Sequence, residues 1–206
     1  MLFRSSVTPG SSTNVEAGRM KEVYRQSILS TSGIVADPWE ITYGPDNYLW
    51  ITEAKGYRVF RMDPDSGSRT TVLDISRGST FFSAPADQAF NAQFDIGVNN
   101  PQGGFAGLAL HPQFMAASSP QNYVYVSYVH SYGGGSSPNG IFYTNRLVRF
   151  TYNPVTNRLE SPESLCDTLP GSNDHNSQRM IIAPVSGTYY LFYASGDLGA
   201  GQFSRF

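Results

Sequence analysis

The fold is decided by a stretch of short apolar runs broken by turn residues, Ile41-Thr42-Tyr43-Gly44-Pro45-Asp46-Asn47-Tyr48-Leu49-Trp50-Ile51-Thr52. Short runs rich in β-branched and aromatic residues, bounded by Gly, Pro, Asn and Asp, are typical of strands joined by tight turns. Two more such runs follow at residues 58–62 and 69–73, separated by the turn sequence Asp63-Pro64-Asp65-Ser66-Gly67. This part of the chain therefore predicts four consecutive β-strands.

The same pattern returns twice further along the chain. The second copy has runs at 108–112, 123–127 and 146–150, a turn at 153–157 and a last strand around Leu159, and the third copy has runs at 181–184 and 189–193. The prolines that end the first run of each copy, Pro45, Pro112 and Pro184, recur about every 70 residues. Repetition of a four-stranded unit is the signature of β-propeller blades.

A closed propeller needs typically four to eight blades, and this repeat length leaves room for about two and a half in 206 residues. We therefore expect an all-β fold in which the propeller ring is incomplete. Residues 1–22 are rich in Ser, Gly and Pro and predict a flexible tail, and residues 23–206 predict the N-terminal portion of a propeller domain. The remaining blades of a longer chain are the expected structural partner, because the run at 189–193 would otherwise keep an open apolar edge.

The composition argues against several classes of protein. Charged residues make up 15% of the chain and the net charge is −2, so no basic surface predicts a nucleic-acid partner. No apolar run reaches the roughly 20 residues of a membrane-spanning helix, so we expect no membrane span. Cys166 is the single cysteine, which excludes an internal disulfide.

Three loops are expected to meet although they are far apart in the sequence. In a propeller, the outermost strand of one blade leads to the innermost strand of the next, and these connections converge on one mouth of the central channel. The loops are residues 33–39, 97–104 and 170–178, which carry Gln102, Asp174 and His175. Histidine suits proton transfer because its unperturbed pKa lies near neutrality, whereas the alternative for Asp174-His175 is a solvated turn.

Four stretches together carry a resemblance to a known family. They are Gln102-Gly103-Gly104-Phe105-Ala106-Gly107-Leu108-Ala109-Leu110-His111-Pro112-Gln113-Phe114, then Gly44-Pro45-Asp46-Asn47 with Trp50-Ile51-Thr52-Glu53, the Asp174-His175 loop with Ser177 and Arg179, and Gly196-Asp197-Leu198-Gly199. The set resembles the soluble quinoprotein glucose dehydrogenases, also called the glucose/sorbosone dehydrogenase family. The resemblance runs from about residue 24 to the end of the chain, in the order of the family.

This resemblance implies a six-bladed propeller that binds pyrroloquinoline quinone with calcium and oxidises aldose sugars at C1. It implies that His175 is the general base, that Asp174 orients substrate and base, and that Gln102 lies near quinone and sugar. The family's calcium ligands and cationic clamp lie in later blades, so no metal ligand is assigned in this chain. These 206 residues are therefore expected to bind neither cofactor tightly and to be inactive alone. A small or protein electron acceptor and a periplasmic or secreted location are further implications.

Some alternatives stay open. The second functional hypothesis is a non-catalytic propeller of the same superfamily that binds carbohydrate or protein. Of the other two histidines, His111 ends a strand and is expected to be structural, and His130 is expected at the surface. The insertion at residues 81–100 is a departure from the family and is expected to affect the shape of the substrate mouth.

Overall fold

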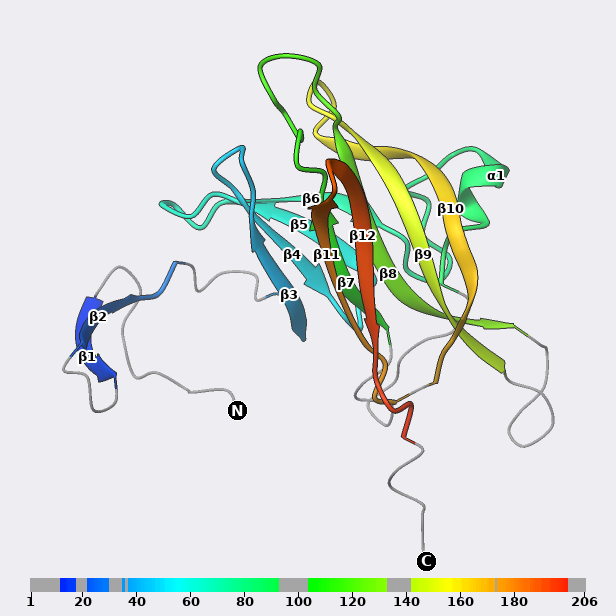
Figure 1. Cartoon of the computed structure of the whole chain (residues 1–206), viewed down its shortest axis with the longest axis horizontal. Helices are drawn as coiled ribbons and strands as arrows, with labels where there is room; N and C mark the ends of the chain where they lie inside the picture. Colours follow the sequence, from blue (N-terminus) through cyan, green and yellow to red (C-terminus); the bar gives the residue numbers. More distant parts are fainter. Residues whose placement is uncertain are drawn as a thin grey trace, which may run out of the picture.

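The computed structural model describes residues 12–17, 22–29, 35, 37–92, 104–132, 142–172 and 174–199. Within these ranges the chain is almost entirely β, and one short helix, α1 (Pro85–Gln88), interrupts the strands. The strands form two four-stranded sheets and two two-stranded ones (Figure 1). The predicted all-β class is therefore confirmed.

The first sheet contains the four strands that the opening stretch predicts. In chain order these are β3 (Pro38–Tyr43), β4 (Leu49–Glu53), β5 (Arg58–Met62) and β6 (Arg69–Asp74), all paired antiparallel. Asp46 fixes the turn between β3 and β4, because its carboxylate accepts hydrogen bonds from Trp50 Nε1 at 3.2 Å and from Arg61 Nε at 2.7 Å. Asn47 follows in the left-handed conformation with φ 62°, which asparagine tolerates better than most residues.

The second sheet repeats this order with longer strands. They are β7 (Phe105–Leu110), β8 (Tyr123–Tyr132), β9 (Phe142–Asn153) and β10 (Arg158–Pro170). β8 continues past residue 127, where the sequence pattern ends, because β9 offers partners as far as Phe142 opposite Tyr132.

His130 lies in this extended part of β8 and is 5% exposed, so the prediction that it is a surface residue is wrong. Burial, together with the nearby charge of Arg146, lowers the pKa of His130 to about 4. The alternating pattern identified the strand but not its length, which is set by pairing with a segment outside that pattern.

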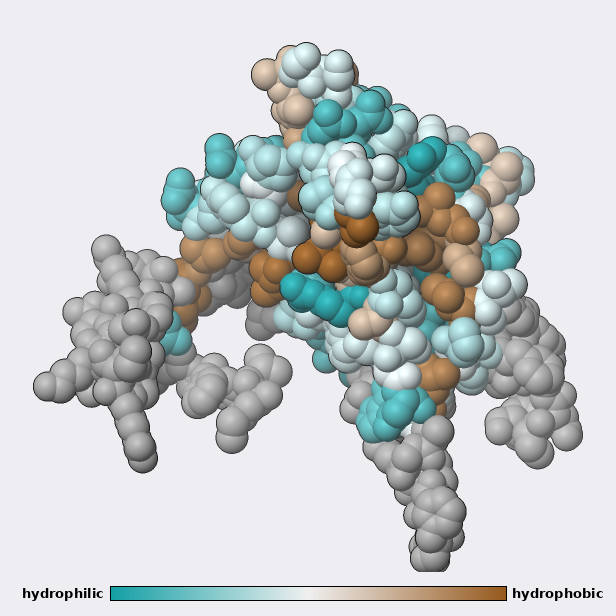
Figure 2. All heavy atoms as spheres, in the orientation of Figure 1, coloured by the Kyte–Doolittle hydropathy of each residue, from teal (hydrophilic) through white to brown (hydrophobic). Residues whose placement is uncertain are grey.

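The third unit is half a blade, as the sequence predicts. β11 (Ser177–Val185) and β12 (Thr188–Ser195) pair as an antiparallel hairpin. Large apolar residues of this hairpin remain exposed, namely Ile181, Val185, Tyr189, Tyr190 and Phe192. Figure 2 shows hydrophobic residues gathered on the face of the molecule where Figure 1 places these two strands. The hairpin therefore exposes large apolar side chains to solvent.

Consecutive sheets pack against each other in chain order. Between the first and second sheets, Trp50 is fully buried and meets Phe114 and Tyr152 edge-on, each with ring centroids 5.3 Å apart. A smaller cluster around Ala109, Leu147 and Met180 joins the second sheet to the β11–β12 hairpin. Sheets that pack face to face in sequence order make an incomplete β-propeller, with β3–β6 and β7–β10 as complete blades.

The segment between the first two blades packs on the core that they share. Phe82 stacks on Phe150 with ring centroids 6.2 Å apart, and Tyr128 Oη donates a hydrogen bond to the carbonyl of Phe90 at 2.6 Å. The described part of the predicted insertion, residues 81–92, therefore lies against the blade interface, and residues 93–100 lie outside the described ranges. The expected effect on the substrate mouth stays a prediction.

The N-terminal region contains a two-stranded hairpin. β1 (Ser12–Ala17), inside the predicted tail, pairs antiparallel with β2 (Glu22–Ser27). In Figure 1 this hairpin stands apart from the blades. The division into a tail at 1–22 and a propeller at 23–206 stays a prediction.

Candidate active site

The first strands of the three blades lie next to one another, as the propeller hypothesis requires. β7 lies beside β3 and β11 (Figure 1). Gly107 in β7 permits this approach, since an added Cβ would meet the carbonyl oxygen of Gln178 in β11 at 1.9 Å. Trp39 Nε1 donates a hydrogen bond to the carbonyl oxygen of Ser177 at 3.2 Å, which brings the ends of the loops at 33–39 and 170–178 together.

The third predicted loop is described only at Gly104. Gln102 lies outside the described residues, so its proposed position near Asp174 and His175 stays a prediction. For the two loops whose ends are described, the expected convergence is confirmed.

The loop before β11 is closed by its own amide side chain. Asn176 is 1% exposed, and its Oδ1 accepts the backbone N–H of Ser172 at 2.9 Å while its Nδ2 donates to the Ser172 carbonyl at 2.8 Å. Asp174 and His175 lie within this closed turn. His175 adopts the left-handed conformation with φ 50°, which non-glycine residues adopt only where surrounding structure imposes it.

His175 is held by carboxylates on two sides. Its Nδ1 lies 2.9 Å from Asp197 Oδ1, and its Nε2 lies 3.8 Å from Asp174 Oδ1. An ionised carboxylate only accepts hydrogen bonds, so the Asp197 contact assigns the proton to Nδ1 in the neutral imidazole and the lone pair to Nε2. The hydrogen bonds from the Gly199 N–H and from His175 lower the pKa of Asp197. This geometry suits an imidazole that accepts a proton at Nε2.

Asp197 is a candidate site residue to which the sequence analysis gave no role. It lies in Gly196-Asp197-Leu198-Gly199, a stretch that carried part of the family resemblance but received no role. The glycines permit the contact, because a Cβ on Gly196 would meet the carbonyl oxygen of His175 at 1.9 Å. A carboxylate in a glycine-rich turn directly after the last strand was the available signal.

A second charged pair joins the first and third blades. Arg179 Nη1 donates to both carboxylate oxygens of Glu40, at 2.7 and 2.8 Å. Glu40 is 4% exposed, and burial raises its pKa in spite of the neighbouring guanidinium. Because these residues start the innermost strands β3 and β11, the pair fixes the two strands relative to each other beside the His175 loop.

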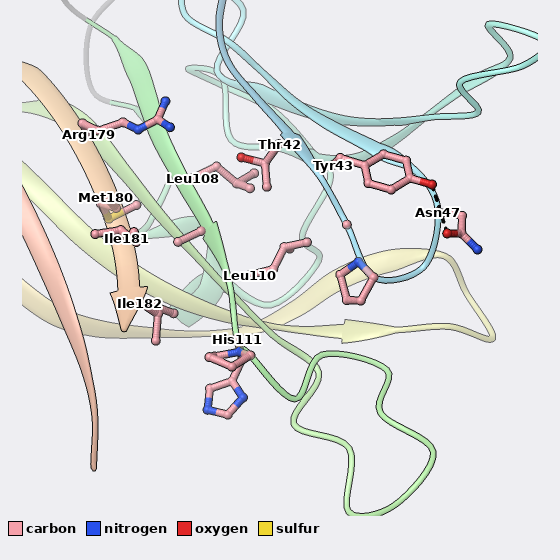
Figure 3. A pocket seen from close by; sticks show the side chains of 14 residues that line it. Thr42, Tyr43, Asn47, Leu108, Leu110, His111, Arg179, Met180, Ile181 and Ile182 are labelled. Carbon is pink, nitrogen blue, oxygen red and sulfur yellow. Dashed lines mark hydrogen bonds between the residues drawn. The ribbon is translucent and has the colours of Figure 1, made fainter. Parts of the chain in front are cut away.

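A hollow lies along the inner strands, beyond Arg179. It has a volume of about 670 Å³ and is lined by β3, β7, β11 and the turns that follow β3 and β7. Figure 3 shows Arg179 at one end, His111 at the other, and Leu108 and Leu110 between them. The His175 loop precedes β11, so the hollow runs toward the opposite end of the strands from the proposed base.

His111 has the structural surroundings that the sequence predicts. Its ring meets Tyr123 and Tyr189 edge-on, and its Nδ1 accepts the Gln113 backbone N–H at 3.1 Å. Burial lowers the pKa of His111. It belongs to the far end of the hollow and not to the loop that holds His175.

The described residues contain neither a grouped set of metal-binding side chains nor a membrane-spanning helix. In the ranges that the structure describes, no three His, Cys, Asp or Glu side chains are grouped closely enough to hold a metal ion. No helix in those ranges is long and apolar enough to cross a membrane.

The chain forms two complete antiparallel blades and half of a third, and a histidine between two carboxylates lies at one end of the inner strands. These features define a β-propeller with a candidate acid–base site. The profile of the Glucose / Sorbosone dehydrogenase family matches residues 35–205. The chain belongs to this family, which confirms the resemblance found in its sequence.

The chain is also similar to named proteins. Quinoprotein glucose dehydrogenase B of Acinetobacter calcoaceticus is 31% identical over 166 residues, which are 80% of this chain and 29% of that protein. The PQQ-bound aldose sugar dehydrogenase from Streptomyces coelicolor has a TM-score of 0.50 at 21% identity, over 84% of this chain and 44% of that one. The apo-form soluble aldose sugar dehydrogenase from Escherichia coli has a TM-score of 0.52 at 18% identity, over 80% and 39%. The chain therefore spans less than half the length of these relatives, and the two structures support the fold.

Proposed function

We propose that this chain provides the proton-accepting side of the active site in a quinone-dependent sugar dehydrogenase. The observation that carries the proposal is the 2.9 Å contact between His175 Nδ1 and Asp197 Oδ1. It fixes the tautomer that leaves the lone pair on Nε2, as a general base requires. Membership of the Glucose / Sorbosone dehydrogenase family supports a sugar as the substrate class, and we propose that the sugar is an aldose oxidised at C1.

In the proposed reaction, His175 Nε2 accepts the proton of the C1 hydroxyl. The Asp197 carboxylate stabilises the imidazolium that results, and Asp174 orients the hydroxyl toward Nε2. Pyrroloquinoline quinone, when bound, supplies the two-electron acceptor. Gln102 is proposed to contact quinone and sugar, and the later blades to supply the calcium site and the cationic groups for the quinone.

The wider setting of the reaction follows from the same family membership. We propose that the remaining blades of a longer chain complete the site, that a small molecule or a protein then takes the electrons, and that the protein works in the periplasm or outside the cell. The 206 residues alone are proposed to bind quinone and calcium weakly and to be inactive, because the groups that hold them are expected in the later blades.

The test is His175→Ala in the full-length protein loaded with quinone and calcium. We expect sugar-dependent dye reduction to fall by about 10²- to 10⁴-fold, the usual contribution of a general base, while quinone binding measured by absorbance is kept. His111→Ala is the matched control, because His111 lies at the far end of the hollow. Turnover unchanged by His175→Ala would refute the assignment. Saccharide binding without turnover in the unmodified protein would favour a binding-only propeller.

A further inference from the structure

We propose that Asn176 is a positioning residue that sets the orientation and tautomer of His175. Asn176 is not expected to touch the substrate, because its side chain is 1% exposed and engaged with Ser172. The proposal deepens the proposed function, on which its kinetic part rests. Its structural part depends only on the contacts of the loop before β11.

The side chain of Asn176 closes the loop in both directions. Its amide oxygen accepts a hydrogen bond from the Ser172 N–H, and its amide nitrogen donates one to the Ser172 carbonyl oxygen. Both backbone polar groups of Ser172 are therefore bonded to this one side chain. The Ser172 Oγ in turn accepts the N–H of Asp174 at 3.2 Å, and Asp174 Oδ1 accepts the N–H of His175 at 3.0 Å. The turn that carries the proposed base is therefore fixed at its two ends by one buried amide.

The backbone of Asn176 connects this loop with the one that carries Asp197. Its carbonyl oxygen accepts the N–H of Gly196 at 2.9 Å and that of Gln178 at 2.9 Å. The neighbouring carbonyl of His175 accepts the N–H of Leu198 at 3.3 Å. The residues on either side of Asp197 are thus hydrogen-bonded to the backbone of the His175 loop. This pairing holds the Asp197 carboxylate next to His175 Nδ1.

The strained backbone explains why a side-chain closure is needed. His175, Ser177 and Gln178 all have positive φ, at 50°, 62° and 65°. Positive φ costs a non-glycine residue about 1–3 kcal/mol unless its surroundings compensate. Without the Asn176 amide we expect the turn to relax, so that His175 leaves Asp197 and its neutral form shifts toward the Nε2–H tautomer that free imidazole side chains favour.

The experiment measures the imidazole directly. The full-length protein is prepared without cofactor and with ¹⁵N-labelled histidine, and the His175 signals are identified by their loss in His175→Ala. In the neutral imidazole of the unmodified protein we expect the proton on Nδ1 and the lone pair on Nε2. In Asn176→Ala we expect averaged shifts of both nitrogens. Asn176→Asp has the same shape, keeps the acceptor for Ser172 N–H and loses the donor to Ser172 C=O, so we expect the same direction of change.

Asn91→Ala is the matched control. Asn91 is also buried, at 7% exposure, and its Nδ2 donates to the Ser79 carbonyl at 3.0 Å, in the segment between the first two blades. We expect this control to lower the thermal midpoint and leave the His175 shifts unchanged. If the Asn176 variants fold and their His175 shifts are unchanged, the proposal is overturned. It is also overturned if Asn176→Ala and Asn176→Asp both fail to fold, because the role of Asn176 would then be in folding and not in positioning His175.

The kinetic arm separates this proposal from the proposed function. In the loaded full-length protein, we expect Asn176→Ala to reduce kcat by about 10²-fold, the cost of a misplaced catalytic group, with KM nearly unchanged. An altered tautomer together with unaltered kcat would support the positioning role and refute His175 as the base. An unaltered tautomer would refute the positioning role alone.

Discussion

Protonation of His130 is expected to make the fold sensitive to acid. His130 is 5% exposed in β8, and burial and the positive charge of Arg146 lower its pKa to about 4, against 6.5 for an unperturbed histidine. The unfolded chain therefore binds the proton first as the pH falls. Because the folded pKa is depressed, stability from neutral His130 is fully present above pH 6.5 and is lost between about pH 6.5 and pH 4.

The size of this effect follows from the two pKa values. One pKa unit corresponds to about 1.4 kcal/mol, so the full difference is on the order of 3 kcal/mol, most of which is lost between pH 7.5 and pH 4.5. The assay is equilibrium urea unfolding of the chain at these two pH values, for the unmodified protein and for His130→Gln, which cannot titrate.

On acidification, the free energy of unfolding of His130→Gln is expected to fall by roughly 2–3 kcal/mol less than that of the unmodified protein. Acid protonates the carboxylates equally in both proteins, so the difference between them isolates His130. An equal loss of unfolding free energy in the two proteins would refute the reasoning, and so would a His130 pKa near 6.5 measured by NMR in the folded protein.

Two further predictions concern Arg179 and the isolated chain. Arg179→Ala is expected to lower the free energy of unfolding at pH 7 by about 1–3 kcal/mol, because it leaves the buried Glu40 carboxylate without its cation. Arg149→Ala, whose partner Glu163 is more than half exposed, should cost less than about 1 kcal/mol, and equal costs in urea unfolding would contradict this explanation. The 206-residue chain supplied with quinone, calcium and an aldose is expected to reduce no dye above a cofactor-free blank, and sugar-dependent reduction would show that the later blades are dispensable.

The blade pattern could be predicted from the sequence because it is local. Alternating apolar residues and the Gly, Pro, Asn and Asp turns mark β3–β6 directly, and Asp46 anchors the turn in which it lies. The full length of β8 and the strand β1 could not be predicted in this way. Both depend on partners that the local pattern does not identify, namely β9 and β2.

The candidate site was predictable only in part for the same reason. Asp174 and His175 are adjacent in the sequence, and the loop rule of a propeller indicated their place. The partner Asp197 is 22 residues away and reaches His175 through positive-φ backbone and the close approach of Gly196. Glu40 and Arg179 are 139 residues apart and meet only because their strands are both innermost. No short sequence pattern contains contacts of this kind.

The attachment of the β11–β12 hairpin has a consequence for how the molecule responds to heat. The proposed base and its carboxylates are all carried by this hairpin and the loops at its two ends, and Ala109, Leu147 and Met180 form the small core that joins it to the second blade. The first two blades share a much larger core, and segments with fewer buried contacts open at lower cost than the whole domain. Warming this chain should therefore release the histidine from its carboxylate while the neighbouring sheets stay intact, so that the His175 NMR signals change before the main melting transition.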